Sequence, residues 1–385
     1  MNQSLMPPLP RSFNRLAGVN LAAQSAEQIS LAAVPIVAVL ALGAGAGEIG
    51  ALATAQTLPF LLLSVPIGLL ADRSSRRALM AVCELLRAAS LLGLMVAALL
   101  GAVTLPLLAV LGFLGAAGTV GFTIAAPALV PVLVAREQLA AANGRLELAR
   151  SAAYAGGPAL AGALVAWAGA TPAFVLAAVL SVAAVVLLRR LVEPPRLAAA
   201  SRHPWIELKE GAAQVWRDPL LRPMLLAALV WNTAWFVLQA AYVPYAVREL
   251  GLSAAAVGST MAAYGVGMVV GALAAPRVMR LLHFGHAVLL GPAMSVLAMA
   301  LMVATLALPR GELAALSFFC FGAGPIIWTI STTTLRQALT PPAMMGRVNA
   351  IFLTANAGPS STDWPNRSTP ITRGAASAPT TMPAP

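Results

Sequence analysis

Long runs of apolar residues follow one another along most of this chain. A helix needs about 20 consecutive apolar residues to cross the roughly 30 Å hydrocarbon core of a bilayer. The runs show no apolar–polar alternation, and a sheet edge exposed to lipid would leave backbone groups unpaired. The sequence therefore predicts an all-α integral membrane protein with about ten transmembrane helices. The predicted helices cover residues 17–43, 50–71, 78–100, 104–127, 147–168, 172–190, 222–246, 253–275, 285–308 and 313–336.

The scarcity of charged residues supports the same prediction. Of the 385 residues, 59% are hydrophobic and 10% are charged, whereas soluble domains carry about 25% charged residues. The net charge of +11 comes from positive residues in the short gaps between apolar runs, not from a basic arm or face. This placement is typical of membrane topology and argues against nucleic-acid binding.

Lysine and arginine are divided unequally between alternate connections. The N-terminal segment and the connections after the second, fourth, sixth, eighth and tenth runs hold most of the 24. The opposite connections hold only Arg248 and Arg310. Because positive residues near helix ends are retained in the cytoplasm, we expect a multi-pass protein of the plasma membrane, the inner membrane of a bacterium, with a cytoplasmic N-terminus.

The helices are expected to form two related groups. An offset of 206 residues aligns the segment around Thr123 and Asn143 with the segment around Thr329 and Asn349, which indicates a duplicated unit. The longest hydrophilic stretch separates six predicted helices from four. The predicted divisions are a six-helix bundle at 1–190, a cytoplasmic linker at 191–221, an incomplete second bundle at 222–350 and a disordered tail at 351–385.

The tail departs from the pattern of the rest of the chain. A complete second copy of the six-helix unit would place two more helices after residue 347. The residues after Gly358 are instead rich in Pro, Ser and Thr, a composition typical of disorder. We therefore expect the last two helices to be missing, through a frameshift or a premature stop.

The connection after the second predicted helix carries the pattern G-x-x-x-D-R-x-x-R-R. An acid at a helix end can hold neighbouring arginines or another helix end through charge-assisted hydrogen bonds, and such contacts could latch one conformation. The alternative is that these arginines only set the topology. An acid among them does not improve topology, which favours the latch. The residues of this motif are Gly68, Asp72, Arg73, Arg76 and Arg77.

This motif resembles the loop motif of the major facilitator superfamily, with Ser75 where a glycine is common. Three more segments resemble the enterobactin-exporter and macrolide-efflux branch: PALVPVLVAREQLAAANG (127–144), GGPALAG (156–162) and LRQALTPPAMMGRVNA (335–350). The likeness extends from about residue 12 to about residue 355. It implies twelve helices in two bundles, alternating access, and proton-driven export of drugs or siderophores. It also implies that the loop motif contacts an eleventh helix, which we expect to be absent.

Polar residues in the first predicted helix are candidates for the transport site. Asn20, Gln24 and Glu27 share one helical face, and a polar stripe in an apolar helix should face the bundle interior. Because an ionised carboxylate is costly in lipid, Glu27 could bind and release protons or bind a cationic substrate. The alternative is hydrogen bonding that only holds the helices together.

Two further helices carry polar or aromatic groups. Glu84 and Arg87 lie one turn apart and should pair, which favours a structural role. Asn232, Trp235 and Gln239 share a face and could contact amphipathic or cationic substrates. Aromatic residues in membrane helices also mark packing or the lipid interface, and this alternative stays open.

A glycine–proline segment lies in the fifth predicted helix. Gly157, Pro158 and Gly162 resemble, imperfectly, the glycine–proline motif of antiporters. Small residues allow helices to approach closely, and proline permits a bend. The segment therefore gives weak support to antiport.

The remaining residue types point away from an enzyme. The three histidines, His203, His283 and His286, lie in predicted cytoplasmic connections without an acidic cluster, so we expect no metal site, no cofactor and no catalytic activity. The prediction is a monomeric efflux transporter that exchanges protons for small amphipathic molecules. Uptake is not excluded, and the other alternative is a truncated, non-transporting remnant.

Overall fold

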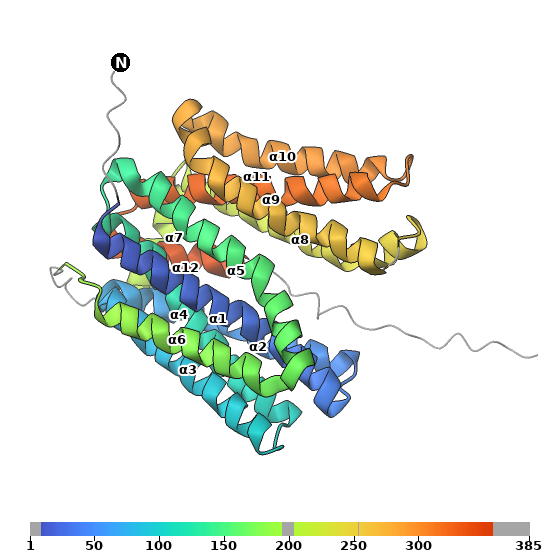
Figure 1. Ribbon diagram of the computed structural model, residues 1–385. Coiled ribbons are helices and arrows are strands. Elements are labelled where there is room, and N and C mark those ends of the chain that lie inside the picture. The colour runs from blue at the N-terminus through green and yellow to red at the C-terminus, as the bar shows by residue number, and fades with distance from the viewer. Residues whose placement is uncertain (1–8, 195–203, 253, 357–385) are drawn as a thin grey trace, which may run out of the picture.

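The computed structural model describes residues 9–194, 204–252 and 254–356, which fold almost entirely into helices (Figure 1). Two single turns of 3₁₀ helix, η1 (Arg136–Gln138) and η2 (Pro342–Met344), precede α5 and α12. The α-helices are α1 (Arg11–Leu42), α2 (Ala46–Arg73), α3 (Arg76–Leu99), α4 (Leu105–Leu133), α5 (Leu139–Ala168), α6 (Ala170–Arg189), α7 (Pro204–Arg217), α8 (Leu221–Arg248), α9 (Ala254–Leu281), α10 (Phe284–Ala304), α11 (Gly311–Leu339) and α12 (Met345–Asn356).

A helix lies at each of the ten predicted positions, and local signals explain several of their ends. Gly43 ends α1 in the left-handed conformation (φ 64°), which glycine adopts without steric cost. The hydroxyls of Ser75 and Thr104 accept backbone N–H bonds at the starts of α3 and α4, as helix N-caps do. Within the described residues, eight helices are long and apolar enough to cross a membrane: α1 to α4, α6 and α9 to α11. The count of ten spans stays a prediction.

Two helices were not predicted. The first, α7, lies inside the segment expected to be a linker, and the second, α12, extends into the segment expected to be a disordered tail. The pattern of apolar runs of about 20 residues could not predict them, because α7 has 14 residues and α12 has 12. Residues 351–356 are therefore helical. The rest of the predicted tail, 357–385, and residues 195–203 of the predicted linker lie outside the described residues.

Along the chain the helices form two groups, the first half (α1–α6) and the second half (α8–α12). In Figure 1, α8 to α11 lie above the first half, whereas α12 lies among the helices of the first half. In the first half α1 packs along α5 and α6, and α3 packs along α4 and α6. In the second half α11 packs between α9 and α10. Two long pairs join the halves, α2 with α12 and α5 with α9, while α7 lies against α8 and α12.

The internal repeat is visible in the element bounds. The sequence α4, η1 and the start of α5 recurs as α11, η2 and the start of α12, with each bound displaced by the 206 residues found in the sequence alignment. The two pairs that join the halves therefore use equivalent parts of each half: α5 of the first half meets α9, and α12 of the second half meets α2. This regularity supports a duplicated unit.

Candidate functional site at the junction of the halves

Two glycines set the close approach of α2 and α12. A methyl group on Gly68 would lie 2.6 Å from Ala350 Cβ, and one on Gly346 would lie 2.5 Å from the carbonyl oxygen of Gly68. Real side chains do not tolerate such distances, so both positions need glycine. The first glycine of the loop motif thus allows the second half to reach the end of α2.

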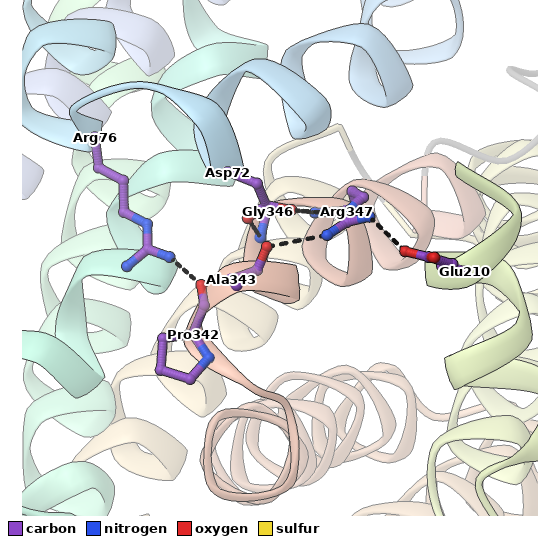
Figure 2. A network of polar contacts seen from close by, with 7 residues as sticks. All are labelled: Asp72, Arg76, Glu210, Pro342, Ala343, Gly346 and Arg347. Carbon is purple, nitrogen blue, oxygen red and sulfur yellow. Dashed lines mark hydrogen bonds and ion pairs between the residues drawn. The ribbon is translucent and has the colours of Figure 1, made fainter. Parts of the chain in front are cut away.

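The carboxylate of Asp72 binds the start of α12 (Figure 2). The backbone N–H of Gly346 donates to Oδ1 (2.6 Å), and that of Arg347 donates to Oδ2 (3.0 Å). The side-chain Nε of Arg347 also donates to Oδ2 (3.0 Å). A negative charge at a helix N-terminus is favourable because the unpaired amides and the helix dipole are positive there. The expectation that this motif lacks its partner helix is therefore wrong, because α12 is present and occupies that place.

Arg347 joins a third element to the contact. Its guanidinium donates to the Ala343 carbonyl (3.1 Å) and lies 3.7 Å from a carboxylate oxygen of Glu210 on α7 (Figure 2). Gly211 of α7 passes so close that an added methyl would lie 3.1 Å from Arg347 Cβ. We call Asp72, Gly346, Arg347 and Glu210 the latch cluster. Glu210 and Arg347 were missed because nothing in the local sequence indicates a partner so far along the chain.

The three arginines of the motif differ in their burial and in their hydrogen-bond partners. Arg76 is fully buried and donates to the carbonyls of Ala128 on α4 (2.6 Å) and Pro342 in η2 (2.6 Å), so it also joins the halves. Arg77 instead donates to the carbonyl of Leu191 (3.1 Å) within the first half. Arg73 is exposed at the end of α2.

Glu193, which the sequence did not single out, caps α3. Its carboxylate accepts the backbone N–H groups of Arg76 (3.2 Å) and Arg77 (3.0 Å) and the hydroxyl of Ser75 (2.6 Å). A carboxylate on the first amides of a helix is stabilising. Glu193, four residues after the end of α6, therefore helps to fix the start of α3, where Arg76 lies.

Buried amides make a second set of contacts between the halves. The amide of Asn143 on α5 donates to Thr334 (2.9 Å) and Gln337 (2.7 Å) on α11, and Gln337 donates to the Pro127 carbonyl on α4 (2.8 Å). Asn349, the repeat partner of Asn143, donates to the Ile124 carbonyl (3.3 Å). The repeat alignment of the two asparagines was the available signal, but it did not reveal that each one crosses between halves.

All these contacts lie at one end of the molecule, where α2 is followed by α3, α4 by α5 and α11 by α12. We call it the arginine-rich end, because Arg76, Arg136, Arg336 and Arg347 lie there. The halves meet at this end through both charged and amide hydrogen bonds.

The predicted polar face of α1 lies inside the first half. Asn20 is buried and donates to the Leu146 carbonyl of α5 (2.9 Å), and Gln24 is also buried. Glu27 is partly buried beside a small cavity of about 30 Å³ that Gln56, Arg87 and other residues also line. Asn20 therefore makes a hydrogen bond between helices, as expected if this polar face only holds the helices together. Glu27 instead borders the small cavity.

Glu84 and Arg87 form a buried ion pair, with Nη1 of Arg87 2.8 Å from Oε1 of Glu84. Arg87 also donates to the Ala23 carbonyl of α1 (3.0 Å) and to the Thr119 hydroxyl of α4 (2.7 Å). Breaking such a pair by removing one partner leaves an uncompensated buried charge. Because Glu84, Arg87 and Arg150 lie close enough to act on the charge of Glu27, the four form one charged cluster inside the bundle.

Aromatic rings line the second half and reach the first. Trp235 stacks on Trp231 and on Tyr264, with ring centroids 5.6 and 4.6 Å apart. Tyr264 of α9 meets Tyr154 of α5 edge-on at 6.0 Å, across the junction of the halves. Asn232 donates to the Ala228 carbonyl of its own helix (2.8 Å). The side chain of Gln239, the third candidate on this face, lies outside the described part of the structure.

The glycine–proline segment of α5 has one position that packing explains. A methyl on Gly157 would lie 2.5 Å from Gln28 Cβ, so Gly157 allows α1 and α5 to touch. Nothing lies within 4 Å of a methyl on Gly162, and Pro158 is exposed. Among the described residues, no group of three or more His, Cys, Asp or Glu could hold a metal ion.

An all-helical protein with membrane-crossing helices, an internal repeat and a charged junction between its halves belongs to the class of two-half membrane transporters. The family model of the Major Facilitator Superfamily matches residues 16–361. The chain belongs to this superfamily of membrane transporters.

One curated relative and several solved structures are similar to the chain. It is 30% identical over 233 residues to an uncharacterized MFS-type transporter, y4rN, of Sinorhizobium fredii. That match covers 59% of this chain and 56% of the relative, so the chain spans about half the length of the curated relative it matches.

The solved structures include a bacterial homologue of the iron transporter ferroportin in an outward-facing state, with a TM-score of 0.75 and 20% identity over 90% of this chain and 89% of that one. They also include the E. coli fucose:proton symporter FucP, with a TM-score of 0.70 and 17% identity over 90% and 88%. At these identities the likeness shows the fold alone.

Proposed function

We propose that this protein is an alternating-access transporter that exports small amphipathic molecules in exchange for protons. The observation that carries the proposal is the Asp72 contact, in which one carboxylate of the first half holds the helix start of the second half. The three hydrogen bonds of this contact share one carboxylate, so they can form and break together. A protein whose halves rock against each other needs such a contact between them.

The arginine-rich end is proposed to be cytoplasmic and closed in this conformation. The positive-inside rule supports the orientation, since most lysines and arginines lie in connections on this side. Closure is supported by the hydrogen bonds of Asp72, Arg76 and Asn143 across the junction. Hydrogen bonds to charged groups contribute about 1.5–3 kcal/mol each, so a few of them suffice to bias two conformations.

Glu27 is the proposed proton site. Within its charged cluster Arg87 is paired with Glu84, and Arg150 is paired with Glu147. Glu27 is left beside the cavity with no ion-pair partner of its own among the described residues. A carboxylate in this position is free to exchange a proton. The proton coupling named for the fucose symporter shows that the same fold supports such coupling in another protein.

The proposed substrate path passes the aromatic rings at the junction. Trp231, Trp235, Tyr264 and Tyr154 form a continuous series from α8 through α9 to α5. Aromatic faces bind flat apolar and cationic groups, which fits amphipathic molecules. Export rather than uptake rests on the resemblance of residues 127–144 and 335–350 to efflux proteins. We further propose that the protein is a monomer of the plasma membrane.

The test uses bacteria that lack their main efflux pumps and carry this chain or its variants. Cellular accumulation of ethidium and of erythromycin would be measured before and after the proton gradient is collapsed with an uncoupler. We expect the chain to lower accumulation of at least one compound, and the uncoupler to abolish the difference. The Glu27→Gln variant should lose the uncoupler-sensitive export of the compound. The matched control is Glu48→Gln, which replaces an exposed acidic residue and should leave this export unchanged. Undiminished and still proton-dependent export by Glu27→Gln would discard the role of Glu27.

A second candidate is a chain that folds into the membrane without transporting. It is favoured by the unequal packing of the halves: α3 has eleven buried residues spread from Arg76 to Ala97, whereas α10 buries only Ala287, Gly291, Ala298 and Met302. The two candidate functions can be distinguished with a fusion that continues, after Asn356, into the corresponding C-terminal region of y4rN. Transport activity and membrane abundance are compared between this fusion and the present chain. Activity only in the extended chain would support the second candidate, and equal activity and membrane abundance would contradict it.

A further inference from the structure

Two buried polar atoms lie without partners at the end of α11. They are Nε of Arg336, in the last turn of the helix, and Oγ1 of Thr340, which follows one turn later. The guanidinium of Arg336 lies over the ring of Phe352 on α12, 4.5 Å from its centroid. Its hydrogen bonding to described residues consists of one long contact, of 3.5 Å, with the Thr333 hydroxyl. A buried donor without an acceptor is costly, and a charged one more so.

Arg336 also lacks a counter-charge among the residues that the structure describes. Arg87, Arg150 and Arg347 each have a carboxylate partner. Within residues 9–194, 204–252 and 254–356, no carboxylate forms an ion pair with Arg336. Its aromatic neighbour, Phe352, is buried in an apolar cluster between α7, α8 and α12. A cation held against such a cluster calls for an anion from outside these residues.

The internal repeat shows that the fold does not need polar residues here. The equivalents of Arg336 and Thr340, 206 residues earlier, are Val130 and Val134, and both are buried in the apolar core of the first half. The equivalent of Phe352 is Leu146, which packs against the same core. The second half therefore has an arginine and a threonine where the first half closes its core with two valines.

We infer that Arg336 and Thr340 form a binding site for an oxyanion, and that its ligand is a phosphate group. The guanidinium and the hydroxyl are both donors suited to phosphate oxygens. Thr340 and Arg136 both line an open cavity of about 380 Å³ at the arginine-rich end. Arg336 lies one helical turn before Thr340 on α11, and side chains four residues apart share a helix face. A phosphate can come from a lipid headgroup, because the site lies at a helix end, or from a small molecule in the aqueous phase.

The experiment uses the full chain purified in a non-ionic detergent and freed of lipid. The midpoint of thermal unfolding is followed while inorganic phosphate, dioleoyl phosphatidylglycerol or uncharged diolein is added. We expect a rise in the midpoint with phosphate-bearing ligands and none with diolein. Response to phosphatidylglycerol alone identifies a lipid headgroup, and an equal response to inorganic phosphate identifies a soluble ligand.

Variants separate a site from general charge effects. Arg336→Val and Thr340→Val should each raise the half-saturating concentration at least tenfold, while Thr340→Ser, which keeps the hydroxyl, should bind as the parent does. Arg280→Gln removes an exposed arginine from the same end and should change nothing. The double variant with both valines should unfold, without ligand, at a temperature no lower than the parent.

Two results would overturn the inference. One is an absent ligand response, or an equal response in the parent and the double-valine variant. The other is a large loss of stability in that variant without ligand, since it would show that Arg336 and Thr340 support the fold itself.

Discussion

Asp72 uses both carboxylate oxygens on two consecutive residues of α12, and so accepts three hydrogen bonds from the second half. Its neighbours show how sequence position decides which half a side chain contacts. Arg76 points to Pro342 in the second half, whereas Arg77, one residue on, points to Leu191 in its own half. The sequence could predict a charged motif and a helix-end contact. It could not predict the partners, because they lie some 270 residues away.

Replacing Asp72 with Asn should weaken the junction. The side chain keeps its size and one acceptor oxygen but loses its charge, so the bonds to Gly346 and Arg347 lose their charge assistance. We expect a loss of about 1.5–3 kcal/mol in the free energy of unfolding, and a transport rate at least tenfold lower. The first is measured by denaturant unfolding in detergent, and the second by accumulation of a transported compound.

The matched control is Asp218→Asn. Asp218 also accepts backbone N–H bonds at a helix start, from Leu220 (2.8 Å) and Leu221 (3.0 Å), but within its own half. Because asparagine caps helices about as well as aspartate, the change should lower stability by less than about 1 kcal/mol and leave transport unchanged. Equal loss of transport in both variants would mean that Asp72 acts as an ordinary helix cap.

At the scale of elements, apolar run length located ten helices because the bilayer imposes one length on every crossing. The same reasoning missed α7 and α12, which are too short to cross and carry charged or polar residues throughout. Both take their stability from tertiary packing: Val215 of α7 and Val348 of α12 are buried in one cluster. A short helix held by packing leaves little mark on the local sequence.

The glycines of α5 give a direct test of helix packing. Gly157→Val should destabilise the protein by about 1–3 kcal/mol, because the new side chain would enter the space of Gln28 on α1. Gly162→Val, in the same helix, meets open space and should change stability far less. The unfolding midpoints of the two variants in detergent check this. Equal destabilisation would contradict the α1–α5 contact described here.

At the scale of the whole molecule, duplication explains why the halves meet in equivalent ways. Asn143 and Asn349 occupy equivalent positions, and each donates across the junction. The repeat could be predicted from the sequence because matching residues recur at a fixed offset. The hydrogen bonds of the two asparagines between the halves could not, because they depend on how the halves are arranged in space.

Replacing each of the two asparagines with Ala should lower the free energy of unfolding by a different amount. Asn143→Ala removes two bonds and leaves the buried oxygen of Gln337 without a donor, so it should cost about 1–3 kcal/mol. Asn349→Ala removes one longer bond of 3.3 Å and should cost less. Denaturant unfolding of the single and double variants measures both. A larger loss for Asn349→Ala would contradict the bonding described for Gln337.

We propose that the Asp72 junction closes one end of a molecule whose halves rock against each other. Distances between spin labels, in a protein with Cys83 and Cys320 replaced by Ser, would detect this motion. One pair, at Ala78 and Leu281, reports on the arginine-rich end, and another, at Leu100 and Leu306, reports on the opposite end; all four positions are exposed. We predict that Asp72→Asn lengthens the first distance and shortens the second. Unchanged distances at both ends, or a change of the same sign at both, would contradict the claim.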